Sequence, residues 1–183
     1  LRTVVDTWYS GVKASSAVRL VTRNAVSLIF PLPVSYKEKI RQVEGVKAVS
    51  YGNWFGGVYI EEKNFFANYA VEAKSYIELY SEYVLPQDQK EAFFRDRRAC
   101  FAGRKLVERF HWKIGDIITL KGTIFLGNWE FVLRGIYYGK NENADEAVFF
   151  FHWDYLNEVL KKRGSIFADQ VGFYMVGVKD PNR

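Results

Sequence analysis

Cysteine, histidine and methionine are scarce in this sequence: among its 183 residues, one is cysteine, two are histidine and one is methionine. Cys100 therefore has no partner for a disulfide within the chain. It lies in the apolar run ACFA, residues 99–102, which favours a small buried side chain. Neither His111 nor His152 stands at a short ligand spacing from another such residue. Because a zinc site needs several thiolate or imidazole ligands, we predict no metal site.

Long hydrophobic runs are also missing. The densest apolar stretch, AVFFF at residues 147–151, has the length of a strand, whereas a membrane-spanning helix needs about 18 apolar residues. Hydrophobic residues make up 49% of the chain and charged residues 26%, which indicates a globular unit rather than a disordered or membrane-embedded one. No signal peptide is recognisable and the chain starts at Leu1, so we expect a piece of a longer protein.

Nucleotide-binding motifs are missing as well. The sequence has neither the G-x-G-x-x-G spacing of dinucleotide sites nor a G-x-x-x-x-G-K-[ST] phosphate loop, and we predict no cofactor. The net charge of +5 would suit a nucleic acid, but the 26 basic residues are interleaved with 21 acidic ones. The tight basic clusters, at residues 95–98 and 161–163, lie in or at the end of helical patterns. We therefore predict no nucleic-acid partner.

The stretch HWKIGDIITLKG, residues 111–122, has the composition of an active-site fragment, with a histidine, an aspartate and two glycines. A serine hydrolase of the G-x-S-x-G type would carry that elbow motif, and the sequence contains none. Gly115 and Asp116 suit a tight turn between a short helix and a strand. We predict a structural role for His111 and Asp116, no catalytic residue, and a chain that is not an enzyme.

Adjacent carboxylates leave one alternative open. Glu61 with Glu62, or Asp145 with Glu146, would provide acids for glycoside hydrolysis, and the aromatic content of 17% would provide rings that stack on sugars. Neighbouring side chains on a strand or loop point in different directions, which argues against either pair acting on one bond. A carbohydrate-binding or hydrolytic extracytoplasmic module is thus the alternative function.

Strand and helix patterns at the two ends of the chain predict two matching β-α-β units. Pro31 and Pro33 end the first strand, Ser35 and Glu38 form a capping box for the helix that follows, and Gly45 ends that helix. The predicted elements are a strand at 17–30, a helix at 35–45 and a strand at 46–52, then a strand at 146–151, a helix at 152–164 and a strand at 170–178.

The middle of the chain has a different pattern. We predict hairpin strands within residues 58–80, helices at 86–99 and 103–110, and strands at 116–120 and 129–139 that pair through a turn around Gly122 or Gly127. The predicted fold class is α+β with two lobes. Residues 1–80 and 140–183 form a discontinuous lobe of two β-α-β units, and residues 81–139 form an inserted smaller α+β lobe.

Several segments, taken in order and spacing, resemble the extracytoplasmic core domain of MacB-like permeases from the FtsX/MacB group of ABC transporters. These segments are IRQVEGVKAVS at 40–50, CFAGRKLVERFHWKIGDIITLKG at 100–122, FVLRGIY at 131–137, and the closing helix and strand. The resemblance implies a MacB-like periplasmic core domain, held between the first two transmembrane helices of a permease in the inner membrane of a bacterium. It also implies that the lobe made from both chain ends is porter-like.

Family resemblance further implies a function in transport without catalysis by this domain. ATP would be hydrolysed by a cytoplasmic ATPase subunit or domain of the same transporter, and the resulting movement would pass through the membrane helices to the periplasmic domain by mechanotransmission. Implied partners are a second permease copy, joined through the missing membrane helices, and a periplasmic adaptor, a lipoprotein or an exported substrate.

Candidate partner-binding residues occur in two places. One is the segment YGNWFGGVY at 51–59, which is dense in glycine and aromatic residues, and the other is the basic cluster in the helix at 86–99. We expect the inserted lobe to carry the main contacts, with the aromatic segment as a second candidate. The candidate residues are Trp54, Phe55, Tyr59, Arg95, Arg97 and Arg98.

Overall fold

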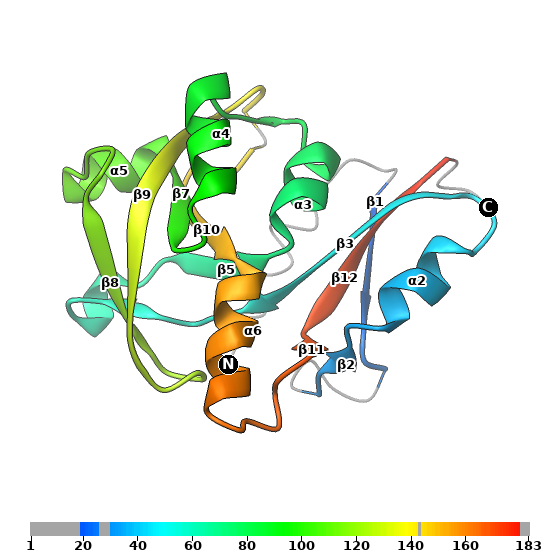
Figure 1. Cartoon of the computed structure of the whole chain (residues 1–183). Coiled ribbons are helices and arrows are strands. Elements are labelled where there is room, and N and C mark those ends of the chain that lie inside the picture. The colour runs from blue at the N-terminus through cyan, green and yellow to red at the C-terminus, as the bar shows by residue number, and fades with distance from the viewer. Residues whose placement is uncertain (1–18, 26–29, 143, 180–183) are drawn as a thin grey trace.

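A mixed ten-stranded sheet forms the centre of the computed structural model, which describes residues 19–25, 30–142 and 144–179 (Figure 1). The strand order is β1-β12-β3-β5-β10-β7-β9-β8-β4, and β6 pairs with β9 beside this path. The pairs β5–β10 and β7–β9 are parallel, and the other neighbours are antiparallel. The strands are β1 (Arg19–Arg23), β3 (Val46–Trp54), β4 (Val58–Tyr59), β5 (Ala67–Val71), β6 (Tyr83–Val84), β7 (Ala99–Gly103), β8 (Ile117–Gly122), β9 (Gly127–Gly139), β10 (Val148–His152) and β12 (Phe173–Val178).

Helices cover both faces of this sheet. The described helices are α2 (Tyr36–Arg41), α3 (Ala73–Leu79), α4 (Gln87–Arg95), α5 (Arg104–Phe110) and α6 (Trp153–Lys162), with a 3₁₀ turn at Glu62–Asn64 and a two-stranded sheet of β2 (Leu32–Pro33) and β11 (Gln170–Val171). Side chains of α2, α5 and α6 pack into one hydrophobic core, and side chains of α3 and α4 pack into the other. None of the described helices is long and apolar enough to cross a membrane.

Strand β10 shows why the sequence carries its densest apolar run here. Phe149 and Phe151 belong to the first core, while Val148 and Phe150 belong to the second. Successive side chains of a strand point to opposite faces, so a strand covered on both sides needs apolar residues at every position. The run AVFFF is therefore central sheet, which confirms the predicted strand.

The predicted elements at the chain ends are confirmed with different bounds; β3, for example, runs to Trp54, two residues beyond the prediction. Of the strand expected at 17–30, β1 covers Arg19–Arg23, and residues 17–18 and 26–29 lie outside the described part. The helix after Ser35 forms, but its capping box does not, because Ser35 has helical backbone angles and makes no side-chain cap hydrogen bond. The hairpin predicted around Gly122 or Gly127 is confirmed, with these two glycines paired across β8 and β9.

Two further predictions are wrong. The strands expected to form a hairpin within residues 58–80 do not pair with each other, since β4 pairs with β8, and β5 pairs with β3 and β10. Residues 73–79, expected as part of a hairpin, form helix α3, in which Tyr76 stacks on Tyr80 one turn later with ring centroids 4.4 Å apart. The helix expected at 86–99 ends at Arg95, and the ACFA run begins strand β7. Apolar packing decided both cases, since Tyr76 fills the second core and every residue of β7 is buried.

Strands from residues 81–139 lie together in the sheet. β7, β9 and β8 are neighbours, and β10, from the closing part of the chain, joins β7 to β5. The ranges predicted as two lobes thus share one sheet, and their division into lobes stays a prediction.

Candidate functional site

The stretch from His111 to Gly122 is built as a helix end, a turn and a strand. His111 is exposed and ends α5 with left-handed backbone angles, φ 55° and ψ 34°. Asp116 accepts a hydrogen bond from the Lys113 backbone N–H at 2.8 Å, and the Gly115 N–H donates to the Leu133 carbonyl at 2.8 Å. Gly115 has φ 96°, where a side chain would be strained. His111 therefore ends the helix, and Asp116 closes the turn that follows it.

His152 and Cys100 are both buried. His152 stacks on Phe93, and its Nε2 donates to the Phe93 carbonyl at 2.8 Å. Burial lowers the pKa of His152, which disfavours the protonated imidazole. Burial raises the pKa of Cys100 well above its ordinary value, which suppresses the nucleophilic thiolate.

Carboxylates singled out for the hydrolase alternative have structural partners. Glu146 accepts from the Gly139 backbone N–H at 2.8 Å and pairs with Arg104 at 3.0 Å, and these contacts lower its pKa. Asp145 caps the Ala147 N–H at 2.8 Å, and Glu61 pairs with Lys63. The general acid of a glycosidase needs a raised pKa and a second carboxylate opposite it. The pKa of Glu146 is lowered, which is the opposite of what that role requires. Within the described residues, no group of three His, Cys, Asp or Glu side chains is arranged to hold a metal ion.

The aromatic candidates of residues 51–59 are largely internal. Phe55 is fully buried in the first core and packs edge-on against Phe151 at 5.1 Å, so its ring presents no surface to a partner in this structure. Tyr59 is half-buried, and its hydroxyl accepts from Trp112 Nε1 at 3.1 Å. Trp54, also half-buried, packs on Tyr69 at 5.1 Å. Trp54 and Tyr59 keep part of their surface exposed.

The three arginine candidates are exposed on and after α4. Arg95 pairs with Glu91 at 3.2 Å one turn earlier, and Arg97 pairs with Glu158 of α6. The exposed Arg98 is adjacent to Asp96 in a turn, where its backbone N–H donates to that carboxylate at 3.0 Å. Two of the three cations are therefore already neutralised by neighbours, which weakens the cluster as a docking surface.

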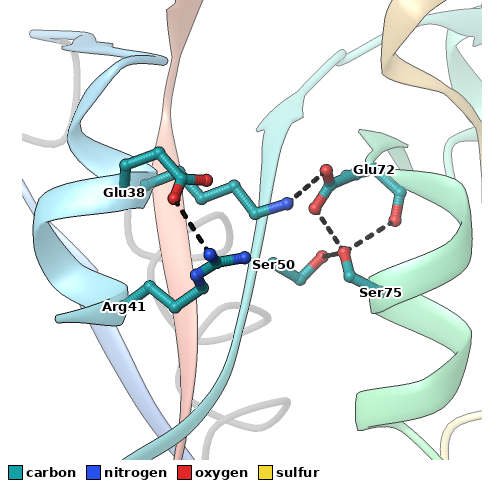
Figure 2. Close-up of polar contacts among 6 residues, drawn as sticks. Glu38, Arg41, Ser50, Glu72 and Ser75 are labelled. Carbon is teal, nitrogen blue, oxygen red and sulfur yellow. Dashed lines mark hydrogen bonds and ion pairs between the residues drawn. The ribbon is translucent and has the colours of Figure 1, made fainter.

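A group of polar contacts, here called the polar clasp, joins α2 to α3 across β3. It consists of Lys37, Ser50, Glu72 and Ser75. Lys37 Nζ contacts Glu72 Oε1 at 2.5 Å, Ser75 donates to the same carboxylate, and Ser75 Oγ lies 2.9 Å from Ser50 Oγ. Figure 2 shows Glu72 and Ser75 facing each other with Ser50 beside them, and the exposed pair Glu38–Arg41 nearby. Lys37 approaches glutamate rather than a serine, so the clasp binds helices together instead of activating a nucleophile.

A second group, here called the arginine clamp, ties β1 to the segment after α3. The nearly buried Arg19 guanidinium donates to both carboxylate oxygens of Glu82 and to the Leu79 carbonyl at 2.9 Å. It also lies 4.2 Å over the ring of Tyr80. Charge-assisted forked hydrogen bonds are the strongest that side chains make, so the clamp fixes the edge strand β1 to the α3 side of the sheet.

One exposed apolar surface was missed by reasoning from the sequence. It is here called the apolar tip and consists of Ile124, Leu126, Ile166 and Phe167, from the β8–β9 turn and the loop after α6. The two loops meet, since Arg163 Nη1 donates to the Leu126 carbonyl at 2.6 Å and Phe125 packs edge-on against Phe167. Three apolar residues between Gly122 and Gly127 are unusual for a hairpin turn, and that signal was available in the sequence.

Three solved structures share this fold along most of the chain. The periplasmic region of MacB from Actinobacillus actinomycetemcomitans matches 92% of this chain and 78% of its own, with a TM-score of 0.60 and 11% identity. The extracellular domain of the noncanonic ABC-type transporter YknZ from Gram-positive bacteria matches 90% and 83%, with a TM-score of 0.57 and 12% identity. A permease-protein domain from Porphyromonas gingivalis matches 87% and 63%, with a TM-score of 0.52 and 12% identity.

No protein-family model and no curated protein matches the sequence. At 11 to 12% identity, the likeness to the solved structures establishes the arrangement of the chain rather than its partners. The chain has the fold of the MacB-like extracytoplasmic domains of ABC transporter permeases.

Proposed function

We propose that this chain is a non-catalytic extracytoplasmic domain of an ABC transporter permease, and that it passes ATP-driven movement from membrane helices to a partner or an exported substrate. A cytoplasmic ATPase supplies the energy in this proposal. The permease dimerises through membrane helices that are not part of this sequence, and the domain lies on the periplasmic side of a bacterial inner membrane.

One observation carries the proposal, in a fold shared with the extracytoplasmic domains of transporters: the two ends of the described chain lie side by side. Arg19 pairs with Gly177 in the antiparallel ladder of β1 and β12, so β1 begins at the side of the sheet where β12 ends (Figure 1). A domain inserted between two consecutive membrane helices needs neighbouring entry and exit points. The placement of β1 and β12 meets that need.

The arrangement of the sheet supports a mechanical role. β1, β12 and β3, next to the chain ends, connect through β5 and β10 to β7, β9 and β8. Movement of the ends therefore reaches residues 81–139 through a continuous hydrogen-bonded sheet that is packed on both faces. In this proposal residues 1–80 and 140–183 act as the porter-like lobe, and residues 81–139 carry the contacts with the partner.

Topology of the parent protein is the first test. Alkaline phosphatase, which is active outside the cytoplasm, is fused after Lys179 in the full-length protein, and a fluorescent protein that folds only in the cytoplasm is fused there in a parallel strain. We expect phosphatase activity and no fluorescence. The reverse pattern would end the proposal.

Transmission is tested by distance measurement in the reconstituted transporter. Within this chain the buried Cys100 resists labelling, so a cysteine introduced at the exposed Leu126, in a transporter cleared of other accessible cysteines, accepts the spin label. We expect the distance between the labels of the two permease copies to change on ATP binding, with an ATPase variant unable to bind ATP as control. Identical distances in both states would contradict mechanical transmission while leaving the topology result intact.

A further inference from the structure

The apolar tip exposes more hydrophobic surface than its loops need for folding. The exposed fractions are 86% for Ile166, 72% for Leu126, 52% for Ile124 and 38% for Phe167. Phe125, between two of these residues, is buried against Phe55 at 5.9 Å and already anchors the turn. Hairpin turns are usually polar. The large aliphatic side chains on either side of Phe125 are therefore unusual, and they add exposed apolar surface instead of packing in the core.

Hydrogen bonds anchor the β8–β9 turn of the tip to the rest of the chain. Thr123 Oγ1 donates to the Gly56 carbonyl at 2.7 Å, and Trp129 Nε1 donates to the Phe125 carbonyl at 2.8 Å. Arg163 binds the Leu126 carbonyl and lies over the Trp129 ring at 5.1 Å. A surface fixed in advance loses little conformational entropy on binding, which favours specific docking.

Within the two loops of the tip the charged residues are all basic, and Glu130 and Glu158 stand directly outside these loops. Residues 121–129 and 159–168 contain Lys121, Lys161, Lys162 and Arg163 and no carboxylate. Asp169, the next acidic residue after the second segment, pairs with Lys161 at 2.7 Å. The exposed Lys121 and Lys162 therefore flank apolar loops without an acidic residue inside either segment.

We propose that the apolar tip docks a protein partner that presents an apolar groove rimmed by carboxylates. Apolar side chains would fill the groove, and the flanking lysines would guide and orient the acidic rim. The choice of a protein over a lipid surface rests on the proposed function. In Figure 1 the described part of the chain begins with β1 and ends with β12 at the upper right, and the β8–β9 turn lies at the lower left, at the far side of the sheet from these two points.

The test uses this chain and two amphipathic helical peptides as probes. Both peptides carry the same leucine face, and the polar face is glutamate in one and lysine in the other. Binding is followed by fluorescence anisotropy at two salt concentrations. We expect the glutamate peptide to bind at least ten-fold more tightly than the lysine peptide, with the difference shrinking at high salt.

Variants assign the binding to the tip. The double variant Leu126→Ser/Ile166→Ser removes exposed side chains and is expected to weaken binding at least ten-fold. Lys121→Glu/Lys162→Glu is expected to reverse the preference between the two peptides. Ile117→Ser, an exposed isoleucine at the other end of β8, and Lys74→Glu, on α3, are matched controls that keep normal binding. Thermal unfolding of each variant checks the fold.

Three results would overturn the proposal. If the two peptides bind equally, or if the tip variants bind as well as the native chain, the tip does not dock an acidic partner. Sedimentation with phosphatidylglycerol vesicles that is lost in Leu126→Ser/Ile166→Ser would assign the tip to lipid instead. A dimer of the chain that the same variant dissolves would assign it to a second copy. A cytoplasmic location in the fusion test would contradict the transporter assignment and would leave a measured preference for the acidic peptide intact. Failure of the proposed function can therefore be distinguished from failure of the docking proposal.

Discussion

At the scale of single residues, backbone contacts leave no room for a side chain at the start of α5. Gly103 ends β7, and a Cβ at this position would lie 2.0 Å from the carbonyl oxygen of Glu146. Its φ of −68° suits any residue, so the requirement for glycine comes from contact and not from backbone strain. Gly164 is the opposite case, with φ of 63° and open space around it.

Gly103→Ala is therefore expected to lower the free energy of unfolding by about 3 kcal/mol or more, because the chain around Glu146 must move away from β7. In Gly164→Ala the added methyl group meets no neighbour, and only the left-handed backbone conformation is unfavourable. We expect this variant to lower the free energy of unfolding by about 1 kcal/mol. Urea unfolding of both variants measures the difference. Equal losses would mean that the contact between Gly103 and Glu146 relaxes freely.

His152 gives the fold a dependence on pH. Its pKa is lowered by burial from the ordinary 6.5, so below that pH the unfolded chain takes up a proton that the folded chain does not. Stability is fully present above pH 6.5 and falls as the pH is lowered toward the folded-state pKa, by up to about 1.4 kcal/mol per pH unit. Glu146 and Asp169, whose pKa values are lowered, lose their contribution only at more acidic pH.

Urea midpoints measured between pH 7 and pH 5 test this dependence. We expect a decline in the native chain and a flat profile in His152→Phe, which keeps a ring on Phe93 and removes the titrating group. His111→Gln, at the exposed histidine, should decline like the native chain. A native profile without any decline would show that the imidazole is protonated equally in both states.

At the scale of elements, β1 is an edge strand held by β12 on one side and by the arginine clamp. The Arg19 side chain is 5% exposed and Glu82 is 18% exposed, so the loss of one partner leaves a charge buried without compensation. By contrast, Arg41 and Glu38 on α2 form a pair that is open to water.

Arg19→Met is expected to destabilise the chain by about 3 kcal/mol and to speed hydrogen exchange at the β1–β12 ladder. Glu82→Gln should have a similar but smaller effect, and the double variant should lose less than the sum of the two. Arg41→Met is the matched control and should leave exchange and unfolding nearly unchanged. Additive losses in the double variant would mean that Arg19 and Glu82 act independently.

Elements with one dominant signal were predictable from the sequence, and elements decided by distant contacts were not. The hairpin of β8 and β9 follows from alternation and its two glycines, and α6 follows from the spacing of Leu156 and Leu160. The helix α3 was missed because tyrosine and isoleucine favour strands locally, while their burial in the second core depends on β5 and β10.

The candidate site was less predictable than the fold. Phe55 and Trp54 are adjacent, yet one is buried in the first core and the other packs at the second, and only the sheet pairing shows which face is covered. Glu158, which neutralises Arg97, lies 61 residues away along the chain. Such partners are set by the order of strands, for which the sequence carries no local signal.

At the scale of the whole molecule, both cores draw on both predicted lobes. Phe55 packs against Phe125, Phe131 and Phe151, which come from residues 81–139 and from β10. In the second core, Phe150 of β10 stacks on Phe101 of β7 with ring centroids 4.9 Å apart. Neither predicted lobe completes its apolar packing alone.

We therefore expect the chain to unfold in a single cooperative step. Tryptophan fluorescence reports on Trp129 and Trp112 as well as Trp153, and far-ultraviolet circular dichroism reports on the whole backbone. Both should give the same urea midpoint. Separate midpoints would indicate that residues 81–139 fold and unfold as an independent unit.

The pairing of Arg19 with Gly177 also decides how the domain bears load. These residues form the described rung of the β1–β12 ladder nearest the chain ends, and antiparallel strands pulled apart at one end open like a zipper, one rung after another. Such a ladder opens at low force because the pairs of hydrogen-bonded residues are loaded one after another and not together. Arg19 is both the first rung and the anchor of the clamp to Glu82, so tension between the two ends meets a forked ion pair before it meets the ladder. In the mechanism proposed above, the clamp would set the tension above which the domain stretches instead of moving as a rigid body.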